Sequence, residues 1–321
     1  MANNSFGGNI PTLIGDLTNL IQLNLSYNQF TGPLPTETGN LTNLNDLRTK
    51  YNPQLDGDLP TQLGDLTNLT WLELENCQFT GSIPTGLGNL TSLIRLTLNN
   101  NQLTGSIPDQ LGNLTSLTYL TMNNNQLTGP IPPQLGNLTG LTYLTLYVNQ
   151  LTGSIPPSLS NLTGLTQLYL YNNNLSGAIP AQFGTMINLT GLDINDNQLS
   201  GLIPKELGNL TNLTSLGLSG NNLRGSVPSE LGNLTNLNSL ILHSNQLCGD
   251  LPMSLLNLTQ LNDSQGLSLH NNYLNTDVAP ALDSFITLKS SWYTDWKTSQ
   301  GGKCPYFPWP LFIPATTGMG N

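Results

Sequence analysis

Charged residues are scarce in this sequence. Asp, Glu, Lys and Arg make up 8% of its 321 residues, about a third of the share in an average globular protein. The charges that are present are mostly acidic, 18 Asp and Glu against 8 Lys and Arg, which gives a formal net charge of −10. Because a nucleic-acid partner requires a basic surface, we expect no nucleic-acid binding.

Long apolar segments and paired cysteines are missing too. No apolar run approaches the roughly 20 residues that a membrane-spanning helix needs, and the first residues carry no basic and apolar signal segment. The three cysteines, Cys77, Cys248 and Cys304, have unrelated spacings that match neither a disulfide framework nor a zinc site. The sequence therefore implies no cofactor and no metal.

What the sequence does contain is a repeat. An apolar residue followed by proline recurs with the proline at positions 11, 35, 60, 84, 108, 132, 156, 180, 204, 228 and 252. Successive prolines are 24 residues apart, except for one interval of 25 between Pro35 and Pro60. Self-similarity at a fixed period of this length predicts a solenoid of stacked coils.

Each repeat assigns a role to its positions. In the pair Leu96-x-Leu98 the period of two turns both leucines inward from a short strand, while Arg95, Thr97 and Asn99 point outward. An asparagine follows at the turn, as Asn101 does here, and a buried column of such amides can satisfy the turning backbone. Cys77 takes this position in one repeat, so we expect a buried, unreactive thiol.

The pattern Leu-x-x-Leu-x-Leu-x-x-Asn-x-Leu-x-Gly-x-Ile-Pro-x-x-Leu-Gly resembles the plant-type, 24-residue leucine-rich repeat. Receptor-kinase ectodomains, polygalacturonase-inhibitor proteins and bacterial surface leucine-rich-repeat proteins carry it. The resemblance implies an α/β-type solenoid, a leucine-rich-repeat superhelix with a concave parallel β-sheet and convex 3-10 turns. Function in such a scaffold depends on the variable positions rather than on the fold.

The periodicity divides the chain into three regions. Residues 1–275 form the solenoid of about eleven repeats, which starts within a repeat. Residues 276–303 form a C-terminal cap, in which apolar residues at helical spacing predict a short helix within 277–290. Residues 304–321 form a tail rich in proline and aromatics. If the cap folds back, Cys248 and Cys304 can pair.

The outward strand positions differ most between repeats, so we expect specificity to lie there. A charged zone contains Asp46, Arg48, Lys50, Glu73, Glu75 and Arg95. An aromatic zone follows it, and aromatic rings are favoured anchors at binding sites, although they also pack across strands for stability alone. The predicted ligand-binding residues are Trp71, Glu73, Arg95, Tyr119, Tyr143, Tyr147, Tyr169 and Tyr171.

Two pairs in the same columns have a chemical alternative. Glu73 and Glu75 could imitate the carboxylate pair of a glycosidase, but Arg48 and Lys50 lie one strand away, which favours weak ion pairs on an open, wet surface. His243 and His270 share a column in adjacent repeats and could hold a metal, but no third ligand flanks them. We therefore predict a protein that is not an enzyme.

Three functions remain open. The leading hypothesis is an extracellular or cell-surface recognition module that binds a protein, peptide or polysaccharide on its concave face. The first alternative is a polygalacturonase-inhibitor-like inhibitor of a cell-wall hydrolase. The second is an ice-binding or structural surface, suggested by the column of Thr97, Thr121 and Thr145 and by the Asn-Leu-Thr rows on the other side.

The N-terminal end of the solenoid carries a further expectation. Phe6 and Ile10 fall in a first, incomplete coil, and the open end of a repeat stack exposes apolar residues that neighbouring repeats would otherwise cover. We therefore expect another chain or domain to cover this end.

Overall fold

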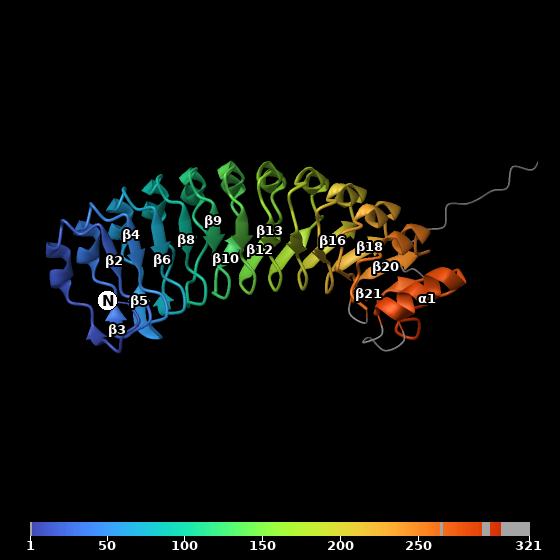
Figure 1. Cartoon of the computed structure of the whole chain (residues 1–321), viewed down its shortest axis with the longest axis horizontal. Helices are drawn as coiled ribbons and strands as arrows, with labels where there is room; N and C mark the ends of the chain where they lie inside the picture. The colour runs from blue at the N-terminus through green and yellow to red at the C-terminus, as the bar shows by residue number, and fades with distance from the viewer. Residues whose placement is uncertain (1, 264–265, 291–295, 303–321) are drawn as a thin grey trace, which may run out of the picture.

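The computed structural model describes residues 2–263, 266–290 and 296–302. The described chain winds into coils that stack side by side in an arc (Figure 1). Each coil contributes a short strand, a turn, in most cases a second extended segment, and a 3-10 helix on the outer edge of the arc. The fold predicted from the sequence, a solenoid of parallel strands with convex 3-10 turns, is confirmed.

The Leu-x-Leu segments form one parallel sheet, the main sheet. Its strands, in spatial order, are β2 (Gln22–Asn24), β4 (Asp46–Arg48), β6 (Trp71–Glu73), β8 (Arg95–Thr97), β9 (Tyr119–Thr121), β11 (Tyr143–Thr145), β13 (Gln167–Tyr169), β15 (Gly191–Asp193), β17 (Ser215–Gly217), β19 (Ser239–Ile241) and β21 (Leu267–Ser268). Both leucines of each pair are buried, as Leu96 and Leu98 illustrate.

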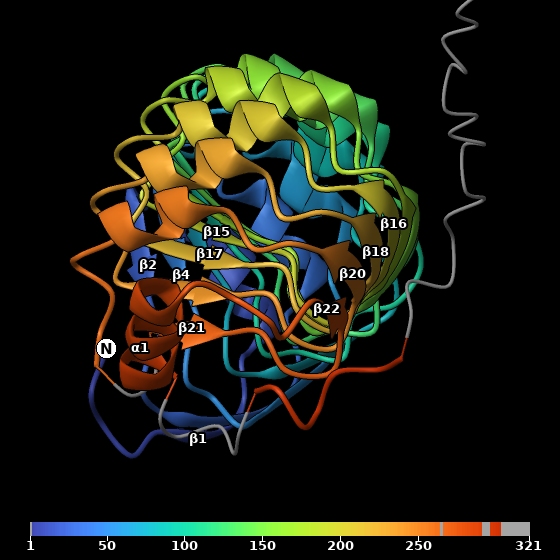
Figure 2. The same cartoon turned by 90° about the vertical axis from the view of Figure 1, so that its right-hand side faces the viewer.

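A second, interrupted sheet follows the turn. Its first part contains β1 (Gly7–Asn9), β3 (Gln29–Pro33), β5 (Gln54–Asp58) and β7 (Gln78–Thr80). Its second part contains β10 (Thr128–Pro130), β12 (Gln150–Ser154), β14 (Asn174–Gly177), β16 (Gln198–Leu202), β18 (Asn222–Gly225), β20 (Gln246–Gly249) and β22 (Tyr273–Leu274). Figure 2 looks along the stack and shows β15 and β17 on one side of the coil and β16 and β18 on the other.

The 3-10 helices close each coil after the proline. They are η1 (Thr12–Asp16), η2 (Thr36–Asn40), η3 (Thr61–Asp65), η4 (Thr85–Asn89), η5 (Asp109–Asn113), η6 (Pro133–Asn137), η7 (Pro157–Asn161), η8 (Ala181–Thr185), η9 (Lys205–Asn209), η10 (Ser229–Asn233) and η11 (Met253–Asn257). The proline that precedes each helix holds an extended conformation, with φ between −59° and −72°, which suits its fixed ring.

The asparagine column joins neighbouring coils, as predicted. Asn125 donates from Nδ2 to the carbonyl oxygens of Leu98 and Met122, each at 3.0 Å, so one amide bonds to two coils. Its Oδ1 accepts the N–H of Leu103 at 3.0 Å. Because buried backbone groups must be paired, this column fixes the turn of each coil against the next. Cys77, in the same column, is buried and free, and burial raises the pKa of its thiol to about 11.

The C-terminal end is covered by α1 (Pro280–Lys289), which lies within the predicted helical segment. Lys289 is buried there, and its Nζ donates to the carbonyl oxygen of Leu261 at 2.8 Å and to Asp263 at 2.6 Å. The predicted tail, 304–321, lies outside the described residues. Cys248 is disulfide-bonded, but Cys304, the partner expected from the sequence, lies outside the described residues too. The division at 275 and 303 stays a prediction.

Candidate functional site

The eight predicted ligand-binding residues lie on consecutive coils of the main sheet. The register pairs Trp71 with Arg95, Arg95 with Tyr119 and Tyr119 with Tyr143, so these four form one column. Glu73 and Tyr169 fall in the next column, because β6 and β13 end on them. Tyr147 and Tyr171 follow their strands and stack on each other. The structure therefore brings the predicted residues together on one face.

The charged zone is more enclosed than the sequence suggests. Glu73 is 2% exposed and lies 2.7 Å from Lys50, 2.9 Å from Arg95 and 3.8 Å from Arg48. The contact with the Nε of Arg95 is an ion pair without hydrogen-bond alignment. Glu75 is also buried and lies 3.7 Å from Lys50.

The prediction of weak pairs on an open, wet surface was therefore wrong, because both carboxylates are buried against long cationic side chains. The lateral pairing itself is confirmed. The pKa of Arg48 is raised chiefly by its hydrogen bond with Asp46 on the same strand, and the charges of Asp46, Glu73 and Glu75 add to this effect. For Lys50, burial acts to lower the pKa, but the hydrogen bond and charge of Glu73 outweigh it and raise the value. The zone contains three cations and three carboxylates, so its formal charge is zero.

Cations and rings alternate across the strands from Arg48 on β4 to Tyr119 on β9. The guanidinium carbon of Arg48 lies 4.9 Å from the centre of the Trp71 ring. Arg95 lies 5.7 Å from Trp71 on its other side and 3.7 Å from the Tyr119 ring. Attraction between a guanidinium and a ring face contributes about 0.5–2 kcal/mol. Trp71 and Arg95 are thus held in place within the protein before any ligand is bound.

The tyrosines form stacks rather than separate anchors. Tyr119 and Tyr143 are parallel with ring centres 4.5 Å apart, and Tyr147 and Tyr171 are parallel at 4.3 Å. These separations are close to the spacing of about 4.8 Å between strands, so in-register placement makes the rings stack. Tyr169 meets Tyr143 edge to face at 6.3 Å and donates its hydroxyl to Gln167. Cross-strand packing therefore covers one face of each stacked ring and leaves the tyrosines partly exposed.

Burial of the stacks also changes the phenols. It raises the pKa of Tyr143 and of Tyr171 to about 12, and it raises the pKa of Tyr169. These hydroxyl groups are consequently neutral at physiological pH and can both donate and accept hydrogen bonds.

The threonine column does not face solvent, contrary to the prediction. Thr97, Thr121 and Thr145 are all buried. Thr121 donates its hydroxyl to Asn99 and Thr145 donates to Asn123, each at 2.8 Å, while Thr97 donates to Glu75. Larger neighbours in the flanking columns cover these short side chains. Thr97, Thr121 and Thr145 therefore cannot form an ice-binding row.

Asp193 is the residue of this face that sequence reasoning missed. It follows Tyr169 in the second column, and burial raises the pKa of its carboxyl to about 6. Its Oδ1 accepts the N–H of Asn195 at 3.1 Å. A Cβ placed on Gly217 of the next strand would lie 2.7 Å from that oxygen, so the carboxylate leans over a position that only glycine leaves open. The sequence did contain a signal for this contact: Asp193 on one strand is paired with Gly217 at the same column position of the next strand.

The histidine pair stacks in the same way. The rings of His243 and His270 are 4.3 Å apart and nearly parallel. Burial lowers the pKa of both, and for His243 the neighbouring His270 lowers it further. Within the described residues no group of three or more His, Cys, Asp or Glu side chains could hold a metal ion.

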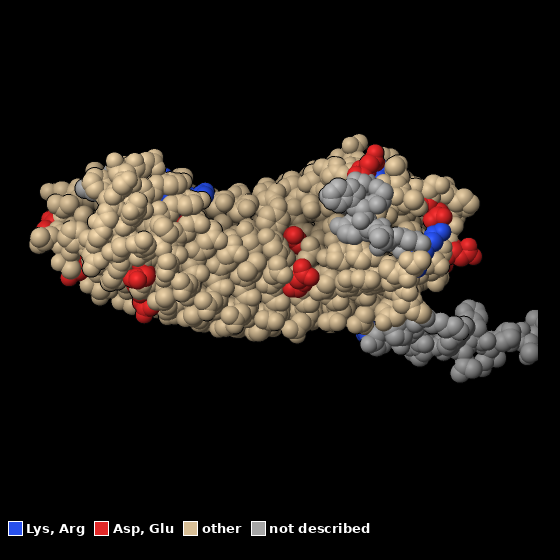
Figure 3. Space-filling model, turned by 90° about the horizontal axis from the view of Figure 1, so that it is seen from below, with Lys and Arg blue, Asp and Glu red and all other residues tan. Residues whose placement is uncertain are grey.

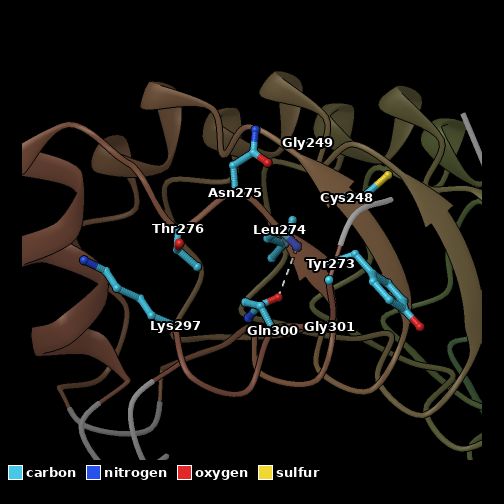
Figure 4. A pocket seen from close by; sticks show the side chains of 10 residues that line it. Cys248, Gly249, Tyr273, Leu274, Asn275, Thr276, Lys297, Gln300 and Gly301 are labelled. Carbon is cyan, nitrogen blue, oxygen red and sulfur yellow. Dashed lines mark hydrogen bonds between the residues drawn. The ribbon is translucent and has the colours of Figure 1, made fainter. Parts of the chain in front are cut away.

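The cavity beside the C-terminal cap serves the fold. It has a volume of about 510 Å³ and lies between β22 and the segment of Lys297 and Gln300 (Figure 4). Gln300 accepts the N–H of Leu274 at 3.1 Å and donates to the carbonyl oxygens of Leu269 and Trp296. Its amide thereby satisfies the exposed edge of the last coil, which is a capping role.

The overall surface agrees with the scarcity of charge in the sequence. Figure 3 shows the molecule hollowed along one long side between its two ends, and few charged atoms lie on the face in view. Among the described residues no helix combines the length and the apolar character that crossing a membrane demands.

Comparison with known proteins assigns the family. The description "Leucine-rich repeat region" matches residues 52–174 and 99–223, which together span more than half of the chain. The chain belongs to the leucine-rich-repeat family. A second leucine-rich-repeat description matches residues 19–41. No curated protein matches this leucine-rich-repeat sequence.

Solved leucine-rich-repeat structures give closer comparisons. The plant peptide hormone receptor RGFR1 in complex with RGF2 is 41% identical, with a TM-score of 0.82 over 85% of this chain and 43% of that chain. A leucine-rich-repeat protein of Leptospira interrogans is 35% identical, with a TM-score of 0.67 over 84% of this chain and 65% of that chain. A plant ice-binding protein is 33% identical, with a TM-score of 0.58 over 71% of this chain and 73% of that chain.

The receptor match supports a leucine-rich-repeat module of the ligand-binding type. This leucine-rich-repeat chain spans less than half of the length of the receptor that it resembles. The similarity therefore concerns the repeat module and its plant-type coils.

Proposed function

We propose that this leucine-rich-repeat chain is an extracellular recognition module that binds a peptide or a segment of a protein across the main sheet between Trp71 and Tyr171. The observation that carries the proposal is the row of preorganised rings on three consecutive coils, from Tyr119 to Tyr171, which Arg95 extends to Trp71 on the two preceding coils. Rings that are already ordered lose little conformational freedom on binding. Similarity to a receptor structure that holds a peptide hormone supports the same class of ligand.

The ring geometry favours a peptide over a polysaccharide at this face. A sugar that stacks on an aromatic ring needs an open ring face. Arg95 lies over Tyr119, Tyr119 and Tyr143 cover each other, and the edge of Tyr169 meets Tyr143. The partly exposed tyrosines carry neutral hydroxyl groups, which suit the alternating donors and acceptors of an extended peptide backbone. The charged zone is internally neutral, so it offers no strong preference for an ionic ligand.

Two observations support the proposed extracellular location. Cys248 is disulfide-bonded, and disulfides persist mainly in oxidising environments. The receptor similarity points to the same compartment.

Selection from a phage-displayed random peptide library tests the proposal. We expect selected peptides to lose about tenfold in affinity, or about 1.4 kcal/mol, when Tyr143 or Tyr169 is replaced by Ala, because a ring edge is lost from the contact. Tyr147→Phe keeps the stack and removes only a hydroxyl, so it separates hydrogen bonding from packing. Ser215→Ala is the matched control on β17 and should change nothing.

The proposal fails if the tyrosine variants bind the selected peptides normally while changes in the Asn-Leu-Thr rows, such as Thr115→Ala, abolish binding. Inhibition assays against polygalacturonases test the inhibitor alternative, which stays a prediction.

Ice binding is the second candidate, because a plant ice-binding protein is similar over most of both chains. With the Thr97 column buried, this reading rests on the exposed Asn-Leu-Thr rows, in which Asn113 and Thr115 recur as Asn137 and Thr139. Such uncharged side chains repeat at the spacing of the coils. Thermal hysteresis that disappears in a Thr115→Glu, Thr139→Glu double variant would support it, and no hysteresis in the wild type would exclude it.

A further inference from the structure

The residue before each ladder asparagine has left-handed backbone geometry. Its φ lies between +51° and +61° in every described coil that has this turn, from Asn3 to Asn271. Most coils meet the requirement with residues that tolerate it, namely Asn3, Asn76, Asn100, Asn124, Asn172, Asp196, Gly220, Ser244 and Asn271. Asparagine, aspartate and glycine are the residues that adopt this conformation with least strain.

Three coils use bulky residues at this position instead. Tyr27 and Tyr51 have a φ of +57° and Val148 has a φ of +51°. Asparagine at the same place in six other coils shows that the backbone does not require a ring. Strained residues of this kind persist where another advantage outweighs the strain, and they gather at functional sites.

The two tyrosines form an exposed aromatic pair outside the main-sheet face. Their rings stack at 4.7 Å with an angle of 10° between the planes, and each residue is 45% exposed. Tyr27 covers one face of Tyr51. Stacking compensates part of the strain in the pair, but nearly half of each tyrosine still faces solvent.

A cavity of about 500 Å³ adjoins the other side of Tyr51. Its lining consists of Tyr51, Pro53, Asn76, Cys77, Gln78 and Asn100. Because these residues follow Tyr51 in the chain while Tyr27 precedes it, the cavity lies on the side of the ring that Tyr27 leaves open. On the main sheet, by contrast, Tyr119 has Arg95 over its ring besides the stacked Tyr143.

Besides the hydroxyl group of Tyr51 and the thiol of Cys77, the polar side chains of the cavity are amides, and none of its lining residues is charged. Asn124 donates to Asn100 at 2.7 Å and Asn100 donates to Asn76 at 3.0 Å, so a line of amides ends at Asn76 beside Tyr51. Gln78 donates to the carbonyl oxygen of Pro53. Planar amides pair with vicinal hydroxyl groups, and an aromatic face packs against the apolar face of a sugar ring.

We propose that Tyr51, supported by Tyr27, and the adjoining amide-lined cavity form a binding site for a neutral oligosaccharide. The site is separate from the peptide-binding face and does not depend on it. An ionic ligand lacks a charged partner in the cavity lining. A purely apolar ligand would cover the donors and acceptors that the amides do not already use among themselves, whereas a sugar offers both an apolar face and hydroxyl groups.

Titration calorimetry with cellohexaose, maltohexaose and mannohexaose tests the site, and trigalacturonate serves as the charged comparison. We expect at least one neutral oligosaccharide to bind the wild type more tightly than trigalacturonate does. Tyr51→Asn should weaken this binding at least about tenfold, the effect of removing an anchoring ring. Tyr51→Phe keeps the ring face and should retain most of the affinity.

Val148→Asn is the matched control, because it makes the same replacement at the same backbone position on a distant coil. Both asparagine variants should keep or raise the melting temperature, since both relieve the left-handed strain, but only Tyr51→Asn should lose sugar binding. The proposal is overturned if the wild type binds none of the three neutral oligosaccharides at millimolar concentration. It is also overturned if Tyr51→Asn and Val148→Asn bind the sugar equally well. Neither result would affect peptide binding at the main sheet.

Discussion

At the scale of single residues, one inserted residue explains why the asparagine column contains a cysteine at position 77. In regular coils the side-chain oxygen of the ladder asparagine accepts an N–H from the preceding coil, as Asn101 accepts that of Phe79 at 3.1 Å. The 25-residue interval adds a residue after Asn52, and the N–H of Leu55 bonds instead to the carbonyl oxygen of Asn52 at 3.0 Å. An asparagine at position 77 would have no N–H to accept there. This loss explains why Cys77 can take its place.

Asp193 makes stability depend on pH. Burial raises its pKa to about 6, above the value of about 3.9 in an unfolded chain. The folded state therefore holds the proton more tightly, and the stability that this contributes is present below about pH 4 and is lost as the pH rises through about 6. Asp193→Asn should raise the free energy of unfolding at about pH 8 by up to about 2 kcal/mol and change little at about pH 4.

Calorimetric melting at the two pH values measures this effect. Asp109→Asn on η5 removes the same charge from an exposed position, so it controls for net charge. Equal shifts for both variants at high pH would show that long-range repulsion, and not burial of Asp193, is responsible.

At the level of strands and coils, the sequence predicts placement better than burial. The period of two and the fixed repeat determine which side chains share a column, so Trp71, Arg95, Tyr119 and Tyr143 could be aligned from the sequence, and the register confirms it. Exposure depends on how far the neighbours reach. Thr97 and Glu73 point outward yet are buried, since Thr97 donates to Glu75 of the preceding coil and the long side chains of Lys50 and Arg95 reach Glu73.

The same reason limits the prediction of the candidate site. Ring stacking depends on rotamers and on the size of the next side chain, which periodicity does not encode. Asp193 carried no pattern of its own, and only the glycine at position 217 indicated that a side chain lies over the next strand. The turn geometry of Tyr51 is likewise invisible in a residue pattern that allows almost any side chain before the ladder asparagine.

Glu73 ties three coils together through its ion pairs with Arg48, Lys50 and Arg95. Removing one partner of a buried charge cluster leaves the others uncompensated, so Glu73→Ala should lower the free energy of unfolding by about 3 kcal/mol. Urea denaturation measures the loss. Glu230→Ala on η10 is the control outside the cluster and should change stability by less than about 1 kcal/mol. Equal losses in the two variants would contradict a structural role for the buried cluster.

Across the whole molecule the two ends of the stack differ. At the C-terminal end α1, Lys289 and the buried Trp296 cover the last coil. At the N-terminal end Ile10 is buried, contrary to expectation, but Phe6 is half-exposed. Leu17 is 51% exposed, whereas Leu41, at the same position of the next coil, is fully buried. The first coil therefore presents core positions that its equivalents bury against a preceding coil.

This apolar end should mediate association. Leu13 and Ile21 extend the exposed surface around Leu17, and both stand where later coils carry polar residues, such as Gln110 and Thr118. Clustered apolar side chains of this kind mark interaction surfaces.

We expect the purified protein to self-associate as its concentration rises, with sedimentation velocity as the measurement. A Leu13→Gln, Ile21→Thr double variant restores the residues of the other coils, so it should shift the equilibrium toward monomer while the melting temperature stays within a few degrees. A wild type that remains monomeric at submillimolar concentration, or a double variant that associates as strongly, would show that this end needs no covering chain.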